Sequence, residues 1–128
     1  MYICFYGTLK NTKSLPVDRH LRYVGKVVVP GLSIYKTPKL PYPLGRVDQT
    51  TTPLPESTVC SCYEVLDEVA IKWFDWVESY DDADVDNSLF VRRVVNTSCG
   101  REVFLYEWNW EYPQIRIEDS SLTRIETW

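Results

Sequence analysis

The sequence has few residues of the kinds that build metal and redox centres. It contains one histidine, His20, and four cysteines, Cys4, Cys60, Cys62 and Cys99. Cys60 and Cys62 are separated by a single residue, which is neither the spacing of a redox CxxC pair nor that of a zinc knuckle. With one histidine, a zinc site would need at least three of the cysteines. We therefore expect four reduced thiols, mostly in strands, and no metal site.

Long apolar runs and clustered positive charge are also lacking. No segment approaches the ~20 consecutive apolar residues of a transmembrane helix, and residues 1–10 lack the basic and apolar regions of a signal peptide. The formal net charge is −4, from 14 Lys and Arg against 18 Asp and Glu, whereas phosphate contact requires clustered Lys and Arg. The composition argues against nucleic-acid and membrane partners and predicts a soluble, cytoplasmic protein.

The chain does contain enough apolar residues for one core. Its 128 residues are 45 % hydrophobic and 25 % charged, which is typical of a single folded domain. Strand patterns come first, then one helix, then a hairpin, and this order predicts an α+β fold rather than a βαβ repeat. The predicted helix is 67–79, and the predicted strands are 2–6, 23–29, 32–35, 44–47, 58–65, 89–96 and 101–108.

The predicted helix carries the clearest amphipathic pattern in the chain. Asp67 is a suitable N-cap. The spacing of i, i+3, i+4 and i+7 that marks a buried stripe is met by Ala70, Trp73, Phe74 and Val77.

Glu78 is placed unusually for a carboxylate. On a helical wheel of ~100° per residue it falls between Phe74 and Ile71, outside the arc of polar side chains. It also lies in the last predicted turn, where the helix dipole disfavours an anion. A carboxyl flanked by apolar groups at that position is expected to have a raised pKa, as a general acid or base requires. The alternative is a glutamate at the edge of the stripe whose carboxylate reaches solvent.

The segment Tyr6-Gly7-Thr8-Leu9 ends the first predicted strand. A strand that stops at Gly and continues with Thr can present successive backbone N–H groups to an anion, such as a carboxylate or a developing oxyanion. The segment is not a P-loop, because the sequence contains no GxxxxGK[ST] pattern. The alternative is an ordinary turn.

Taken together, these segments resemble the γ-glutamylcyclotransferase-like group, which includes the AIG2-like proteins. Residues 4–10 (CFYGTLK) resemble its opening hydrophobic-Tyr-Gly-Ser/Thr-Leu signature, and residues 74–80 (FDWVESY) resemble its Leu-Asp-x-hydrophobic-Glu-Gly-Tyr helix end. The likeness covers roughly residues 1–108. Further matches, in the family's order, are Val24-Gly25, Tyr42-Pro43-Leu44, and residues 62–65, 90–93 and 104–106.

The resemblance implies a small mixed β-barrel with flanking helices, formed by residues 1–110 and followed by a tail, 111–128, that packs on it or extends from it. Members of the family cleave a γ-glutamyl amide by attack of the substrate's own α-amino group on the γ-carbonyl, releasing 5-oxoproline and an amine or amino acid. The nucleophile is tethered to the electrophile, so the effective molarity is high. The resemblance therefore implies a small-molecule γ-glutamyl substrate and no cofactor.

Carried over position by position, the resemblance makes Glu78 the acid/base residue. It makes Tyr106 a tyrosine that lines the pocket, for which a core aromatic is the alternative. Backbone amides of the loop after the first strand would bind the glutamyl part, and Pro43 would lie with Tyr42 at the pocket edge. The implied substrate-binding residues are Tyr6, Gly7, Thr8, Leu9, Tyr42 and Tyr106.

Four residues depart from the family pattern. Ser79 stands where the family often has Gly, Phe90 replaces a frequent Tyr, and Cys60-Ser61 replaces a common Gly-Glu. These departures leave Glu78 in place, but they motivate a second hypothesis, a non-catalytic binding module on the same fold. The sequence does not indicate the leaving group or the oligomeric state. Pocket width is expected to depend on the Pro-rich segment 36–55 and the acidic segment 81–86.

Overall fold

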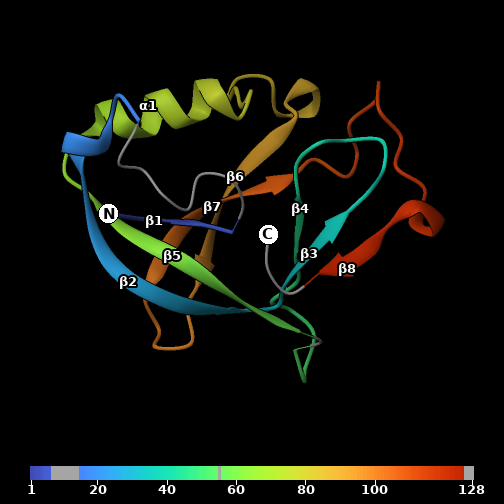
Figure 1. Ribbon diagram of the computed structural model, residues 1–128, viewed down its shortest axis with the longest axis horizontal. Coiled ribbons are helices and arrows are strands. Elements are labelled where there is room, and N and C mark those ends of the chain that lie inside the picture. Colours follow the sequence, from blue (N-terminus) through green and yellow to red (C-terminus); the bar gives the residue numbers. More distant parts are fainter. Residues whose placement is uncertain (7–14, 55, 126–128) are drawn as a thin grey trace.

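The structure is a computed structural model that describes residues 1–6, 15–54 and 56–125. These residues form eight strands and one α-helix (Figure 1). Three short 3-10 helices lie between them, η2 (Asp18–His20), η3 (Val85–Asn87) and η4 (Asp119–Ser121). The main elements are β1 (Tyr2–Phe5), β2 (Leu21–Pro30), β3 (Leu32–Lys36), β4 (Leu44–Val47), β5 (Ser57–Val65), α1 (Glu68–Val77), β6 (Phe90–Asn96), β7 (Glu102–Trp108) and β8 (Thr123–Ile125).

The strands form two sheets, and the predicted α+β class is confirmed. One sheet has the order β2-β5-β1-β7-β6, in which β1 runs antiparallel to β5 and parallel to β7; the other has the order β4-β3-β8. The prediction of a barrel is wrong for the described residues, because these two sheets do not close into one. Where β4 approaches β7, the Val47 amide donates to the Glu107 carboxylate (2.6 Å).

Gly31 is the point at which the chain leaves the first sheet and enters the second. The sequence predicts a turn at Pro30-Gly31, and the structure has Gly31 at φ +82°, between β2 and β3. A Cβ there would lie 2.2 Å from the Asp48 carbonyl oxygen. Only glycine satisfies both the positive φ and this close approach.

The middle strand of the five-stranded sheet, β1, is buried on both faces, whereas the edge strand β2 is largely exposed. Side chains alternate along β1, so that Ile3 and Phe5 join the core cluster that contains α1, while Cys4 and Tyr6 join a second cluster with residues of β3. Helix α1 therefore covers one face of this sheet, and the second sheet covers part of the other (Figure 1). All four cysteines are free, and all except the exposed Cys99 lie buried in β1 and β5.

Helix α1 begins as the sequence predicts, but its buried face is rotated. The Asp67 side chain accepts a hydrogen bond from the Val69 amide (3.0 Å), which confirms the N-cap. The buried residues are Ala70, Ile71 and Phe74, whereas Trp73 is half-buried and Val77 is 37 % exposed. Ile71, and not the predicted Val77, is therefore part of the buried face. This rotates the buried face of the helix toward the side on which Glu78 lies.

The last strand, β8, was not predicted. It pairs antiparallel with β3, with Ile125 opposite Ile34, and Arg124 forms an ion pair with Glu56. The segment that follows residue 110 thus completes the three-stranded sheet.

Among the described residues, no helix has the length and apolar character needed to cross a membrane.

Candidate active site

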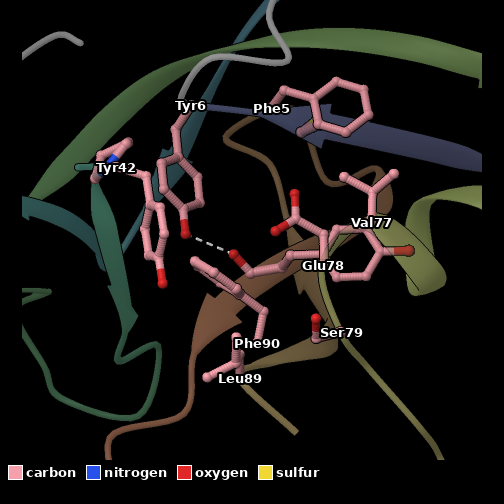
Figure 2. A pocket seen from close by; sticks show the side chains of 11 residues that line it. Phe5, Tyr6, Tyr42, Val77, Glu78, Ser79, Leu89 and Phe90 are labelled. Atoms are coloured by element: carbon pink, nitrogen blue, oxygen red, sulfur yellow. Dashed lines mark hydrogen bonds between the residues drawn. The ribbon is translucent and has the colours of Figure 1, made fainter. Parts of the chain in front are cut away.

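A pocket of about 220 Å³ opens where the end of β1 meets the end of α1 (Figure 2). One wall comes from residues at the end of α1 and the start of β6, and the facing wall comes from β1 and from the segment before β4. Figure 2 shows Glu78 and Val77 on one side of the pocket and Tyr6 and Tyr42 on the other. The lining residues are Cys4, Phe5, Tyr6, Tyr42, Pro43, Val77, Glu78, Ser79, Leu89, Phe90 and Tyr106.

Glu78 is positioned by a complete helix C-cap. It is the C-cap residue of α1. The Ser79 amide donates to the Trp76 carbonyl (3.2 Å) and the Tyr80 amide to the Asp75 carbonyl (2.8 Å), which is the Schellman pattern. Ser79 takes the left-handed conformation that this pattern requires, with φ +53°. The backbone on both sides of Glu78 is therefore held by hydrogen bonds.

The strain at Ser79 leads to a prediction about stability. A side chain with a Cβ is disfavoured in the left-handed region by roughly 1–2 kcal/mol, and glycine is not. Part of this gain is offset because glycine gives the unfolded chain more freedom. We expect Ser79→Gly to raise the free energy of unfolding by ~0.5–1 kcal/mol in urea titrations. Ser79→Ala is the matched control, since it removes the hydroxyl but keeps the Cβ; an equal gain in both variants would refute the explanation.

The Glu78 carboxylate points into the pocket (Figure 2). Its surroundings are mostly apolar, with Phe5, Leu89 and Phe90 among the lining side chains. Within the described part of the chain, no cation or hydrogen-bond donor contacts the carboxylate. Burial alone raises the pKa of Glu78 to about 7. Near neutral pH, both the protonated and the ionised form of the Glu78 carboxyl group are therefore populated.

Tyr6 lies opposite Glu78, and its hydroxyl is already engaged. The phenol donates to the Tyr106 carbonyl (2.6 Å; dashed in Figure 2) and accepts from the Gly45 amide (3.0 Å). One buried side chain thereby links β1 to β7 and to β4, in the other sheet. Burial raises the pKa of Tyr6 well above its usual value. Tyr6 contributes its ring to the pocket wall, while Gly7, Thr8 and Leu9, the predicted amide donors, lie outside the described residues.

This contact makes Gly45 intolerant of any side chain. A Cβ at Gly45 would lie 2.5 Å from the Tyr6 hydroxyl. Because overpacking and a broken buried hydrogen bond each cost ~1–3 kcal/mol, we expect Gly45→Ala to lower the free energy of unfolding by at least ~2 kcal/mol. Gly100→Ala is the control for the added methyl group, since the space around its Cβ position is open and only its positive φ disfavours a side chain, by ~1–2 kcal/mol. A loss at Gly45 no larger than the loss at Gly100, in thermal or urea unfolding, would contradict the argument.

Tyr106 lines the pocket with its ring but directs its hydroxyl elsewhere. The phenol donates to Asp75 Oδ1 (2.6 Å), and Asp75 Oδ2 accepts from Arg92 (2.7 Å). Burial first, and then the contact with Asp75, raise the pKa of Tyr106. Tyr106 therefore lies both in the pocket lining and in the core, which were the two alternatives for this residue. Its hydroxyl anchors the last turn of α1 to β7.

Tyr42 is half-buried at the pocket edge, with Pro43 beside it. Its ring packs near Phe90 (5.6 Å between centroids) and Trp108 (6.3 Å). Burial, and next the negative charge of Glu78, raise the pKa of Tyr42. No described residue forms a hydrogen bond with its hydroxyl.

Comparison with known proteins identifies the fold. No model of a known protein family and no curated protein sequence matches the chain. Among solved structures, the uncharacterized protein PH0828 from Pyrococcus horikoshii is 20 % identical and matches 98 % of this chain and 86 % of its own, with a TM-score of 0.60. The protein ytfP from Escherichia coli is 15 % identical and matches 99 % of this chain and 93 % of its own, with a TM-score of 0.63. The chain has the γ-glutamylcyclotransferase-like (AIG2-like) fold.

The same fold also matches part of a larger protein. The allophanate hydrolase of Kluyveromyces lactis is 14 % identical, with a TM-score of 0.59, over 97 % of this chain but only 19 % of the hydrolase. The γ-glutamylcyclotransferase-like fold thus occurs both in chains of this size and within a longer enzyme. At these identities, the likeness is one of fold.

Of the predicted site residues, the described lining contains Tyr6, Tyr42, Glu78 and Tyr106; Ser79 and most of the apolar wall were not predicted as site residues. Leu89 was missed because it reaches the site through a tertiary contact, in which its amide donates to the Ser79 carbonyl (3.2 Å). Phe5 and Val77 could have been predicted as pocket residues, since each immediately precedes a predicted site residue. In the part of the chain that the structure describes, no group of three His, Cys, Asp or Glu side chains could hold a metal ion.

Proposed function

We propose that this protein is a cofactor-independent γ-glutamyl cyclotransferase. It would cleave a γ-glutamyl amide by attack of the substrate's α-amino group on the γ-carbonyl, releasing 5-oxoproline and an amine or amino acid. The observation that carries the proposal is the Glu78 carboxyl group, which points into a small pocket, has no partner among the described residues and has a pKa raised to about 7. The fold and the sequence resemblance support the same reaction.

A single carboxyl group with this pKa can serve both halves of the reaction. The Glu78 carboxylate accepts a proton from the α-amino group as its nitrogen bonds to the γ-carbon and the carbonyl oxygen becomes an oxyanion. The protonated carboxyl then gives that proton to the leaving nitrogen as the amide C–N bond breaks, and the carbonyl re-forms. Proton transfer is most efficient when the pKa of the group lies near the working pH.

The pocket suits a reaction centred on one small group. Its volume of about 220 Å³ is below the ~300–1,000 Å³ of sites for drug-sized ligands, which favours an amino-acid-sized moiety with the leaving group toward solvent. Its described lining contains no Lys, Arg or His. The α-carboxylate of a glutamyl group would therefore be held by hydrogen bonds, for which the backbone of residues 7–9 stays the predicted source.

Incubation with γ-glutamyl dipeptides and with γ-glutamyl-ε-lysine tests the proposal. We expect equal amounts of 5-oxoproline and free amine or amino acid, quantified by mass spectrometry. The matched control is the same substrate with its α-amino group acetylated, which cannot cyclise by this route and should stay intact. Release of glutamate instead of 5-oxoproline, or no release from any γ-glutamyl compound, would overturn the proposal.

The second candidate is a binding module without turnover. It is favoured by Phe90, which lines the pocket without the hydroxyl that the family often has there. This candidate predicts that γ-glutamyl compounds raise the melting temperature of the protein while 5-oxoproline never accumulates. Measurable cyclisation would exclude it.

A further inference from the structure

We propose that Tyr42 is a second catalytic residue, whose hydroxyl donates a hydrogen bond to the γ-carbonyl oxygen of the substrate as that oxygen becomes an oxyanion. The inference rests on the proposed function and deepens it, because it assigns a role to the wall that faces Glu78.

Tyr42 is distinguished from the other pocket tyrosines by a hydroxyl that forms no hydrogen bond with any described residue. The Tyr6 phenol is held by the Tyr106 carbonyl and the Gly45 amide, and the Tyr106 phenol is held by Asp75. Neither can turn toward a substrate without leaving a buried partner unpaired, which costs ~1–3 kcal/mol. Among the described residues, Tyr42 is therefore the pocket tyrosine whose hydroxyl a substrate can engage at no such cost.

The Tyr42 ring is also held in place before any substrate binds. It packs near Phe90 and Trp108, which are 8 % and 1 % exposed. On the backbone it stands between Pro41 and Pro43, so its own conformation is restricted by the proline that follows it. A donor that is fixed in advance stabilises a developing charge without reorganisation during the reaction.

The role of Glu78 in proton transfer leaves the Tyr42 side for the oxyanion. Glu78 takes the proton from the attacking nitrogen and returns it to the leaving nitrogen, so its carboxyl group serves the two nitrogens and the carbonyl oxygen needs a separate donor. Tyr42 lies on the opposite wall (Figure 2), and no Lys, Arg or His belongs to the described lining. Burial and the charge of Glu78 both raise the pKa of Tyr42, so its hydroxyl stays protonated near neutral pH and acts as a donor, not as a base. Ser79 also carries a hydroxyl in the lining, but it is the residue next to Glu78 on the near wall.

The test is the steady-state kinetics of Tyr42→Phe with the γ-glutamyl dipeptide, or γ-glutamyl-ε-lysine, that the wild-type protein cyclises fastest. Removing one oxyanion donor typically lowers kcat by 10²–10³-fold. We expect a loss of ~100-fold in kcat with KM and the pH profile unchanged, since the bond forms in the transition state and Glu78 is untouched. Tyr23→Phe is the matched control, because it removes the same hydroxyl from a tyrosine that is 53 % exposed on β2 and is not part of the pocket lining. It should retain wild-type kcat.

Two results would overturn the role of Tyr42 alone: a kcat within ~3-fold of wild type, or a loss carried wholly by KM, which would make Tyr42 a ground-state binding group. If the wild-type protein releases no 5-oxoproline from any γ-glutamyl compound, the proposed function fails and this inference fails with it. Thermal unfolding of both variants is measured alongside. The ring contacts are kept and no described partner is lost, so both should melt close to the wild-type temperature.

Discussion

Replacing Glu78 by Gln should slow the release of 5-oxoproline by ~10²–10⁴-fold, the usual contribution of a general acid or base. The amide has nearly the shape of the carboxyl group but cannot accept the proton of the attacking amine. The measurement is kcat/KM for the best γ-glutamyl substrate at pH 8, where the pKa of about 7 leaves the wild-type group mostly ionised.

Glu68→Gln is the matched control for this variant. Glu68 lies on the same helix, exposed in its first turn, so the same chemical change there should leave kcat/KM at the wild-type value. Glu78→Gln with full activity would mean that another group transfers the proton, and the proposed mechanism would be wrong.

The same substitution should stabilise the protein at neutral and alkaline pH. Because burial raises the pKa of Glu78 from its ordinary 4.5 to about 7, the folded state binds more protons than the unfolded state between these values. Wild-type stability therefore falls as the pH rises from 4.5 to 7, relative to a variant with a neutral group at this position. The full difference corresponds to at most ~3 kcal/mol. It is constant above pH 7 and absent below pH 4.5.

Urea unfolding of wild type and Glu78→Gln at pH 4, 6 and 8 measures this difference. We expect equal free energies of unfolding at pH 4, a partial gain for the variant at pH 6 and the full gain at pH 8. Glu68→Gln should show no pH-dependent gain. An advantage of Glu78→Gln that is the same at all three pH values would come from packing and would contradict a desolvated carboxyl group. A charged group that destabilises its own fold is typical of a functional site.

Local sequence patterns predicted most of the elements but not how the two sheets meet. Seven strands and the helix were found from alternation, helical spacing and turn residues such as Pro30-Gly31, which act over a few neighbouring positions. Strand β8 was missed because it has three residues and its Thr123 and Arg124 are exposed, so it carries no apolar alternation. The barrel prediction failed at the edge between β4 and β7, where Glu107 bonds to Val47 in place of a strand pair.

The candidate site was predictable where it depends on one helix and not where it depends on distant segments. Helical geometry placed Glu78 away from the polar arc of the helix. Because Ile71 is buried and Val77 is not, Glu78 lies closer to the centre of the buried face than predicted. The commitment of the Tyr6 hydroxyl could not be foreseen, because its partners are backbone groups of Gly45 and Tyr106. The pattern of side chains along the sequence does not indicate hydrogen bonds to distant backbone groups.

The most direct test of the central claim is an NMR titration of the Glu78 side-chain carboxyl carbon, assigned by its absence from the spectrum of Glu78→Gln. The structure predicts a pKa of about 7 for this group. A value near 4.5, the ordinary value of a glutamate, would show a solvated carboxylate and would remove the physical basis for proton transfer by Glu78.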